Sequence, residues 1–127
     1  MIVGLGIDFV DLARVRRVVE RHGERFFERI LTEREQAYCR RFRDPVPHAA
    51  ARFAAKEAVL KALGTGLAKG IRWLDVEVVR DEEGAPSVEL AGRAAEIARA
   101  RSAERVQLSI SHDHGAAIAI AILERGR

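Results

Sequence analysis

The sequence RFAAKEAVLKALGTG, residues 52–66, decides the architecture of this chain. Together with the alanines that precede it from residue 49, it is rich in strong helix formers and nearly all apolar. Gly64 follows the last apolar residues and is the residue type that most often ends a helix. These features predict one long helix over residues 49–63.

Four charged residues interrupt this apolar helix: Arg52, Lys56, Glu57 and Lys61. They form two pairs with a spacing of four, so the members of each pair can share one face of the helix. Two ordinary surface pairs would explain the pattern, and an exposed ion pair such as Glu57 with Lys61 is worth about 0.3–0.5 kcal/mol. A functional cluster is the alternative, and the spacing alone leaves both interpretations open.

The segments before the long helix predict one strand and several shorter helices. The expected elements are a buried strand over 2–10, a helix over 12–22, a short helix over 24–31 and a further helix that starts at Thr32. Asp11 can cap the first helix, and Thr32 with Glu35 has the spacing of a capping box. Pro45 and Pro47 are expected to break the chain before the long helix.

The segments after the long helix predict two hairpins separated by a helix. They are a loop over 64–70, strands over 73–79 and 87–90, a helix over 91–101 and strands over 106–111 and 116–123. The element order indicates one α+β domain, residues 1–127, with a mostly antiparallel sheet packed against the long helix and the shorter helices. The last strand is apolar on both faces, as a central core strand or a strand at a subunit interface would be.

The composition is that of a globular chain with 48% apolar and 32% charged residues. The net charge of +3 and the pI of about 9.6 favour an anionic partner, either a nucleotide, a nucleic acid or an acidic protein. No apolar run approaches the roughly 20 residues of a membrane helix. Cys39 is the only cysteine, so no internal disulfide is possible. We therefore expect a cytoplasmic protein that does not bind membranes.

Three further segments contain side chains suited to chemistry. Asp8 lies near the end of an apolar strand, where a carboxylate is costly unless it is paired, binds a cation or caps the next helix. The loop Gly64-Thr65-Gly66 could admit a phosphate, although it lacks the Walker pattern and a helix C-cap is the ordinary explanation. His112 lies beside serines and Asp113, but this spacing establishes neither a catalytic triad nor a zinc site.

Together these segments resemble the holo-[acyl-carrier-protein] synthases, the small trimeric branch of the phosphopantetheinyl transferases. The matching pieces are GIDFVDLARV at 6–15, RFAAKEAVLKALGTG at 52–66 and LSISHD at 108–113, with weaker matches at 25–35 and 75–86. The resemblance implies magnesium-dependent transfer of 4′-phosphopantetheine from coenzyme A to a serine of apo acyl carrier protein. Adenosine 3′,5′-bisphosphate would be the second product.

The resemblance also implies roles for individual residues. Asp8 and Glu57 would bind magnesium, and Lys61 would complete the catalytic centre beside the coenzyme A pyrophosphate. The positions that match residues near the cofactor are Arg52, Lys56, Lys61, Gly64, Thr65, Gly66 and His112. Arg14 matches a position on the basic helix that docks the acidic carrier protein, with Arg21 or Arg25 assisting. Members of this family form homotrimers with active sites at the subunit interfaces.

Other interpretations stay open at this point. The same transferase chemistry could serve a carrier domain of a larger synthase, and an inactive relative would have the same fold. A small basic nucleic-acid-binding module is the alternative from a different class. The low aromatic content of 6% and the lack of a recognition motif count against nucleic acid as a partner. The proton of the attacking serine would pass to Glu57 or to a metal-bound water.

Overall fold

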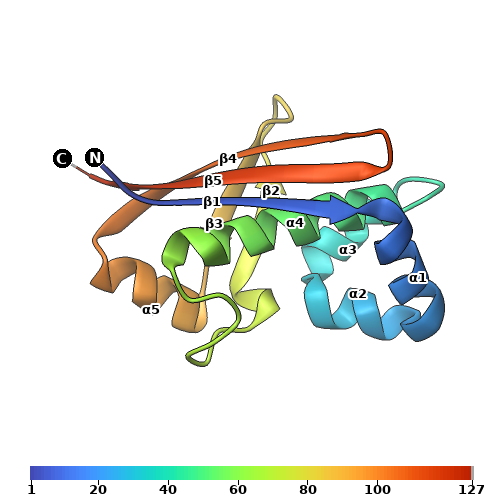
Figure 1. The fold of residues 1–127 in the computed structure, drawn as a ribbon, viewed down its shortest axis with the longest axis horizontal. Coiled ribbons are helices and arrows are strands. Elements are labelled where there is room, and N and C mark those ends of the chain that lie inside the picture. The colour runs from blue at the N-terminus through green and yellow to red at the C-terminus, as the bar shows by residue number, and fades with distance from the viewer. Residues whose placement is uncertain (127) are drawn as a thin grey trace.

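The computed structural model describes residues 1–126 (Figure 1). Its elements are β1 (Ile2–Asp11), α1 (Leu12–His22), α2 (Glu24–Ile30), α3 (Glu33–Cys39), α4 (Val46–Leu63), the 3-10 turn η1 (Trp73–Asp75), β2 (Val76–Arg80), β3 (Pro86–Leu90), α5 (Gly92–Ala100), β4 (Ala103–Asp113) and β5 (Ala116–Arg125). The predicted α+β class with antiparallel strands is confirmed.

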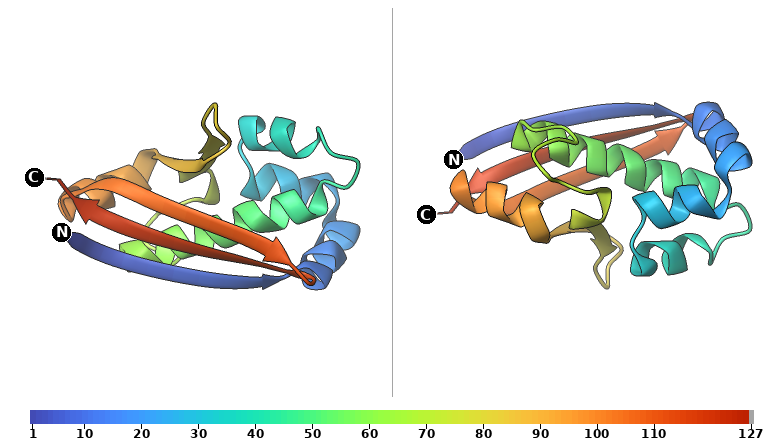
Figure 2. Two further views of the ribbon diagram at one scale, coloured as in Figure 1. Left: turned by 90° about the horizontal axis from the view of Figure 1, so that it is seen from above. Right: turned by 90° about the horizontal axis from the view of Figure 1, so that it is seen from below.

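The strands form a three-stranded sheet in the order β1-β5-β4 and a separate β2-β3 hairpin, both antiparallel. The long helix α4 runs along one face of the larger sheet (Figure 2). Helices α1, α2 and α3 gather at the end of the molecule where β1 ends, and α5 lies at the other end, near both termini (Figure 1). Within residues 1–126, no helix combines the length and apolar composition that crossing a bilayer requires.

The two apolar faces of β5 have different environments. Ala117, Ala119 and Ala121 are fully buried on the side that faces α4, whereas Ile118 and Ile120 are partly exposed on the other side. The exposed isoleucines lie beside Leu5, Ile7 and Phe9 of β1, which are 57–65% exposed. We call these five residues the outer sheet face. The single chain therefore buries one face of β5 in its core and leaves the other uncovered.

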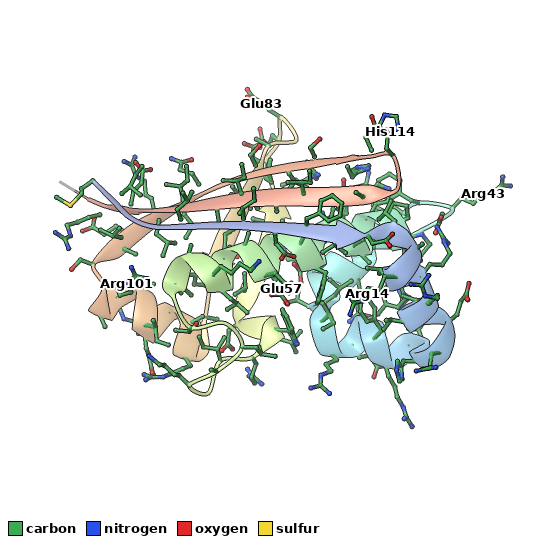
Figure 3. The ribbon with its side chains drawn as sticks, viewed as in Figure 1. Arg14, Arg43, Glu57, Glu83, Arg101 and His114 are labelled. Atoms are coloured by element: carbon green, nitrogen blue, oxygen red, sulfur yellow. The ribbon has the colours of Figure 1, made fainter. Side chains whose placement is uncertain are left out.

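Glycines in β1 let this strand approach α4 closely. A Cβ atom at Gly4 would lie 2.2 Å from the carbonyl oxygen of Ala62, and one at Gly6 would lie 1.9 Å from that of Ala58. Arg101, labelled in Figure 3, donates hydrogen bonds to the carbonyls of Ala62 and Val3, and so ties the end of α4 to β1. This close approach holds the Asp8 end of β1 against the same helix.

Replacing Gly6 with alanine is expected to lower the free energy of unfolding by about 1–3 kcal/mol or more, the range for overpacked cores. The added methyl group would overlap the backbone of α4, which has little freedom to shift. Urea unfolding measures the effect, and Ser87→Ala on the exposed surface of β3 is the control, with a change within about 0.5 kcal/mol. Equal stabilities of the two variants would contradict the tight strand–helix contact.

Several local predictions hold at the helix ends. The Asp11 side chain accepts a hydrogen bond from the Ala13 N–H at 3.0 Å, and Thr32 and Glu35 form the predicted capping box. Gly64 ends α4 in the left-handed conformation, with φ of 79°. These features depend only on neighbouring residues, which is why the sequence pattern suffices to predict them.

Several predicted boundaries were wrong, and β4, predicted over 106–111, spans Ala103–Asp113. Helix α4 begins at Val46, so Pro47 lies within its first turn and does not break the chain. Proline is tolerated there because the first N–H groups of a helix have no partner within the helix. Residues 73–75 form a 3-10 turn, and the strand starts only at Val76. The buried Asp75 carboxylate accepts the Arg72 N–H at 3.1 Å, which favours the turn over an extended strand.

Cys39 is fully buried at the end of α3. Burial raises the pKa of its thiol to about 11. Because the thiolate is the reactive form, this cysteine is an inert packing residue.

Candidate active site

The three predicted catalytic residues lie around one cavity of about 660 Å³ between β1, α1 and α4. Asp8 comes from the end of β1, and Glu57 and Lys61 come from successive turns of α4. Arg14 of α1 lines the same cavity, and Figure 3 shows it on the same side of the molecule as Glu57. The remaining wall is mostly apolar and includes Val15, Val18, Phe26 and Phe53.

Lys61 joins the strand to the helix at this cavity. Its ammonium group lies 2.9 Å from Asp8 Oδ1 and 3.1 Å from the carbonyl oxygen of Ile7. Asp8 therefore has an ion-pair partner, and it is Asp11, not Asp8, that caps α1. The hydrogen bond and the charge of Asp8 raise the pKa of Lys61, so this side chain is a cation at neutral pH.

Glu57 lies partly buried beside a second carboxylate. Burial raises the pKa of the Glu57 carboxyl, the negative charge of Asp8 raises it further, and Lys61 opposes both. Two carboxylates held this close repel each other in their ionised forms. A cation between them would relieve that repulsion.

The donor set of this cavity fits magnesium. Among residues 1–126, no group of three or more histidine, cysteine or acidic side chains is arranged to hold a metal ion. The cavity instead offers the carboxylates of Asp8 and Glu57, while the third carboxylate in its lining, that of Asp11, caps α1. Magnesium prefers oxygen ligands and is commonly held by one or two carboxylates, with water and substrate phosphates completing its shell. A site with two carboxylates on an open cavity therefore suits this ion when a phosphate ligand is also bound.

The chain matches the model of the 4′-phosphopantetheinyl transferase superfamily over residues 4–121. It belongs to this family. The holo-[acyl-carrier-protein] synthase of Syntrophotalea carbinolica is 50% identical over 121 residues, 95% of this chain and 94% of the relative. That of Maridesulfovibrio salexigens is 45% identical over 125 residues, 98% of this chain and 100% of the relative. The resemblance drawn from the motifs is confirmed.

Solved structures of holo-[acyl-carrier-protein] synthases have the same fold as this chain. The holo-[acyl-carrier-protein] synthase of Neisseria meningitidis superposes with a TM-score of 0.90 at 34% identity, covering 98% of this chain and 100% of that one. The Helicobacter pylori enzyme, solved in complex with coenzyme A, superposes with a TM-score of 0.84 at 34% identity, covering 94% of this chain and 99% of that one.

The glycine loop of this transferase acts as a helix cap. The N–H groups of Gly64, Thr65 and Gly66 all donate to carbonyl oxygens in the last turns of α4. Residues 64–66 are also absent from the lining of the cavity around Asp8. These backbone groups are therefore engaged by the helix rather than turned toward a phosphate.

Lys56 lies inside the protein and not at the cavity. Its ammonium group is fully buried, 2.7 Å from Glu35 Oε1 and 3.1 Å from the carbonyl oxygen of Trp73. The surface pairs considered from the spacing of four do not form, because Lys56 pairs with Glu35 and Lys61 pairs with Asp8. Glu35 belongs to another helix, and its capping-box pattern gave no sign of this second role.

Arg52 lines a second pocket, of about 410 Å³, on another side of α4. Its guanidinium is buried, lies 4.0 Å from the centre of the Tyr38 ring, and donates to the carbonyl oxygen of His48 at 3.4 Å. Within residues 1–126, its Nε has no hydrogen-bond partner. The other basic residues of this pocket are Arg34, Arg41 and Arg80. The sequence gave no indication of them, because they are scattered over α3, the segment after it and β2.

His112 lies on β4, with its ring 6.0 Å from that of His48. β4 and β1 are opposite edges of the sheet. Six of the predicted site residues thus fall into two groups in this family member. Asp8, Glu57, Lys61 and Arg14 line one cavity, and Arg52 and His112 lie near the other edge.

Of the arginines predicted to dock a carrier protein, Arg14 is the one that lines the cavity. Arg21 lies in the last turn of α1 and Arg25 in α2, and both are exposed. Neither lines the cavity, and both add positive charge to the exposed surface of α1 and α2.

Proposed function

We propose that this protein transfers 4′-phosphopantetheine from coenzyme A to a serine hydroxyl of an apo acyl carrier protein. Adenosine 3′,5′-bisphosphate is the second product. The observation that carries this proposal is the meeting of Asp8, Glu57 and Lys61 at one cavity in a member of the transferase family. The relatives' name, holo-[acyl-carrier-protein] synthase, and the coenzyme A complex of the Helicobacter pylori enzyme support it.

The residues of the cavity suit displacement at phosphorus. The transition state spreads negative charge over phosphate oxygens, so catalysis depends on positioned positive charge. The Lys61 side chain lines the cavity and is 52% exposed, so its ammonium group can contact a pyrophosphate. A magnesium ion held by Asp8 and Glu57 would supply further positive charge at the phosphates.

Glu57 is the carboxylate suited to accept the serine proton. Asp8 is already paired with Lys61, whereas Glu57 forms no ion pair among the described residues.

The outer sheet face supports assembly into a homotrimer. Contiguous exposed apolar side chains of this kind mark association surfaces. Asp8 and His112 lie on opposite edges of the sheet, so packing of these faces can bring the β1 edge of one subunit to the β4 edge of the next. The active site would then be shared between subunits.

The positive surface of α1 and α2 suits an acidic carrier protein. Arg14 at the cavity would contact the carrier beside the reacting serine, and the exposed Arg21 and Arg25 would steer its approach. We also propose a cytoplasmic location, where the buried free thiol of Cys39 stays reduced.

Replacing Arg14 with glutamate is expected to raise KM for the carrier protein by roughly tenfold or more and to leave KM for coenzyme A nearly unchanged. The introduced charge would repel an acidic partner at the cavity opening. Arg17→Glu is the matched control, because it makes the same charge change on the same helix outside the cavity lining. If Arg14→Glu changes both KM values equally, Arg14 has no specific role in docking the carrier protein.

The proposed function is tested by mass spectrometry of an apo carrier protein after incubation with the enzyme, coenzyme A and magnesium. Transfer adds a phosphopantetheine of about 340 Da to the carrier, and a chelator is expected to abolish the gain. Parallel assays with carrier domains of larger synthases identify the preferred acceptor. No mass gain on any carrier would refute the proposal.

A further inference from the structure

Helix α4 packs against the sheet through very small side chains. Ala54, Ala58 and Ala62 of the helix are buried, and they face a sheet that contributes alanines from β5 and the two glycines of β1. Alanine and glycine surfaces allow close approach but have no long side chains that interlock. This contact therefore does little to fix the rotation of α4 about its own axis.

The rotation of α4 nevertheless decides the geometry of the cavity. Successive residues of a helix point about 100° apart, so a modest rotation moves a side chain from one neighbour to another. Glu57 and Lys61 reach the cavity from one side of α4, and Asp8 reaches it from β1. The Lys61 and Arg101 contacts tie α4 to β1, and a contact with elements on another side of the helix would further restrict its rotation.

The buried ion pair between Lys56 and Glu35 is such a contact. Both side chains have no exposed surface, and their charged atoms lie 2.7 Å apart. Glu35 is itself fixed by the N–H groups of Thr32 and Val78, each 2.9 Å from one of its carboxylate oxygens. Lys56 also donates to the carbonyl oxygen of Trp73. The network thus connects α4 to α3, η1 and β2.

The same network adjoins the cavity wall. The ring of Trp73 lies 5.2 Å from that of Phe53, which lines the cavity one turn before Glu57. Rotation of α4 would break the charged contacts of Lys56 in a dry interior. A buried charge without its partner is strongly unfavourable, whereas the net stabilisation from an intact pair is small. Such a pair is thus better suited to specify one arrangement than to add stability.

We propose that Glu35 and Lys56 are positioning residues whose buried ion pair fixes the rotation of α4 and so holds Glu57 and Lys61 at the cavity with Asp8. The proposal rests on the proposed transferase function. It assigns Lys56 a role different from the cofactor contact that the family resemblance implied. That contact would need an exposed ammonium group, and both bonds of Lys56 point into the protein.

Glu35→Asp tests this role, because it keeps the charge and shortens the side chain by one methylene far from the cavity lining. Val59→Ala is the matched control, since Val59 is fully buried on the same helix and outside the network. We expect Glu35→Asp to raise the magnesium dissociation constant, measured by calorimetry, and to lower kcat, each by about 10–100-fold as for outer-shell residues of metal sites. KM for the carrier protein is expected to change less than about twofold, because Arg14 is untouched.

Val59→Ala is expected to lower the melting temperature without changing the magnesium dissociation constant or the kcat of the folded protein. If Glu35→Asp is unfolded at the assay temperature, the magnesium dissociation constant and kcat of Lys56→Arg are measured instead. If the tested variant, Glu35→Asp or Lys56→Arg, has the same magnesium affinity and kcat as Val59→Ala, the ion pair contributes only to stability and the proposal is overturned. A wild-type protein that transfers no phosphopantetheine would instead overturn the proposed function.

Discussion

Replacing Glu57 with glutamine is expected to lower kcat for phosphopantetheine transfer by about 10²–10⁴-fold, the range for loss of a general base. Glutamine keeps the shape of the side chain but can neither accept the serine proton nor carry the negative charge that pairs with magnesium. The rate is measured as adenosine 3′,5′-bisphosphate released at saturating coenzyme A and carrier protein. Calorimetry of the same variant gives the magnesium dissociation constant, which is expected to rise.

Glu96→Gln is the control for this change, because Glu96 is exposed on α5 and lies outside the cavity lining. Its kcat is expected to equal that of the wild type. The pH–rate profile separates the two roles of Glu57. Lost magnesium affinity with an unchanged profile would leave Glu57 as a metal ligand and assign the proton to another acceptor. A kcat within tenfold of the wild type would remove Glu57 from the reaction.

Features that depend on neighbours in the sequence could be predicted well. The cap at Asp11, the capping box at Thr32 and the end of α4 at Gly64 each involve residues within one helical turn. The motif spacing also indicated the transferase family. The position of Asp8 beside Lys61 required that family resemblance, because 53 residues separate the two along the chain.

The partners of the charged residues on α4 could not be predicted from helical spacing. The spacing of four describes side chains on an exposed helix, where ion pairs are worth a few tenths of a kcal/mol. Helix α4 is buried on most sides, so its charged groups must find partners on other elements. Glu35 of α3 forms the ion pair with Lys56, and no sequence pattern near either residue reveals that pairing.

The second pocket was missed for a similar reason. Tyr38 and Arg41 lie in a divergent segment with no motif, and they meet Arg52 and Arg80 only after α3 packs between α4 and β2. The sequence of β5 also did not show which of its two faces would be exposed. Alanine and isoleucine are both apolar, so only the packing of α4 on the alanine side distinguishes the core face from the outer sheet face.

Replacing Lys56 with alanine is expected to lower the free energy of unfolding by about 3–5 kcal/mol, the range for breaking one side of a buried ion pair. The change leaves the fully buried Glu35 carboxylate without its cation and the Trp73 carbonyl oxygen without its donor. Urea unfolding measures the loss, at one protein concentration so that the proposed subunit assembly would contribute equally to both proteins. A loss below about 1 kcal/mol would mean that water reaches Glu35, and the interior described for α3 and α4 would be incorrect.

The double variant Glu35→Leu, Lys56→Met separates the charge from the packing. Removing both charges is expected to be less destabilising than the sum of the single changes, because neither partner is left alone in the interior. The double variant should still be less stable than the wild type. Glu35 also accepts hydrogen bonds from the N–H groups of Thr32 and Val78, and these groups would lose their acceptor. A double variant that folds well but binds magnesium weakly would show that the ion pair orients α4, because apolar side chains can fill the same space without fixing its rotation.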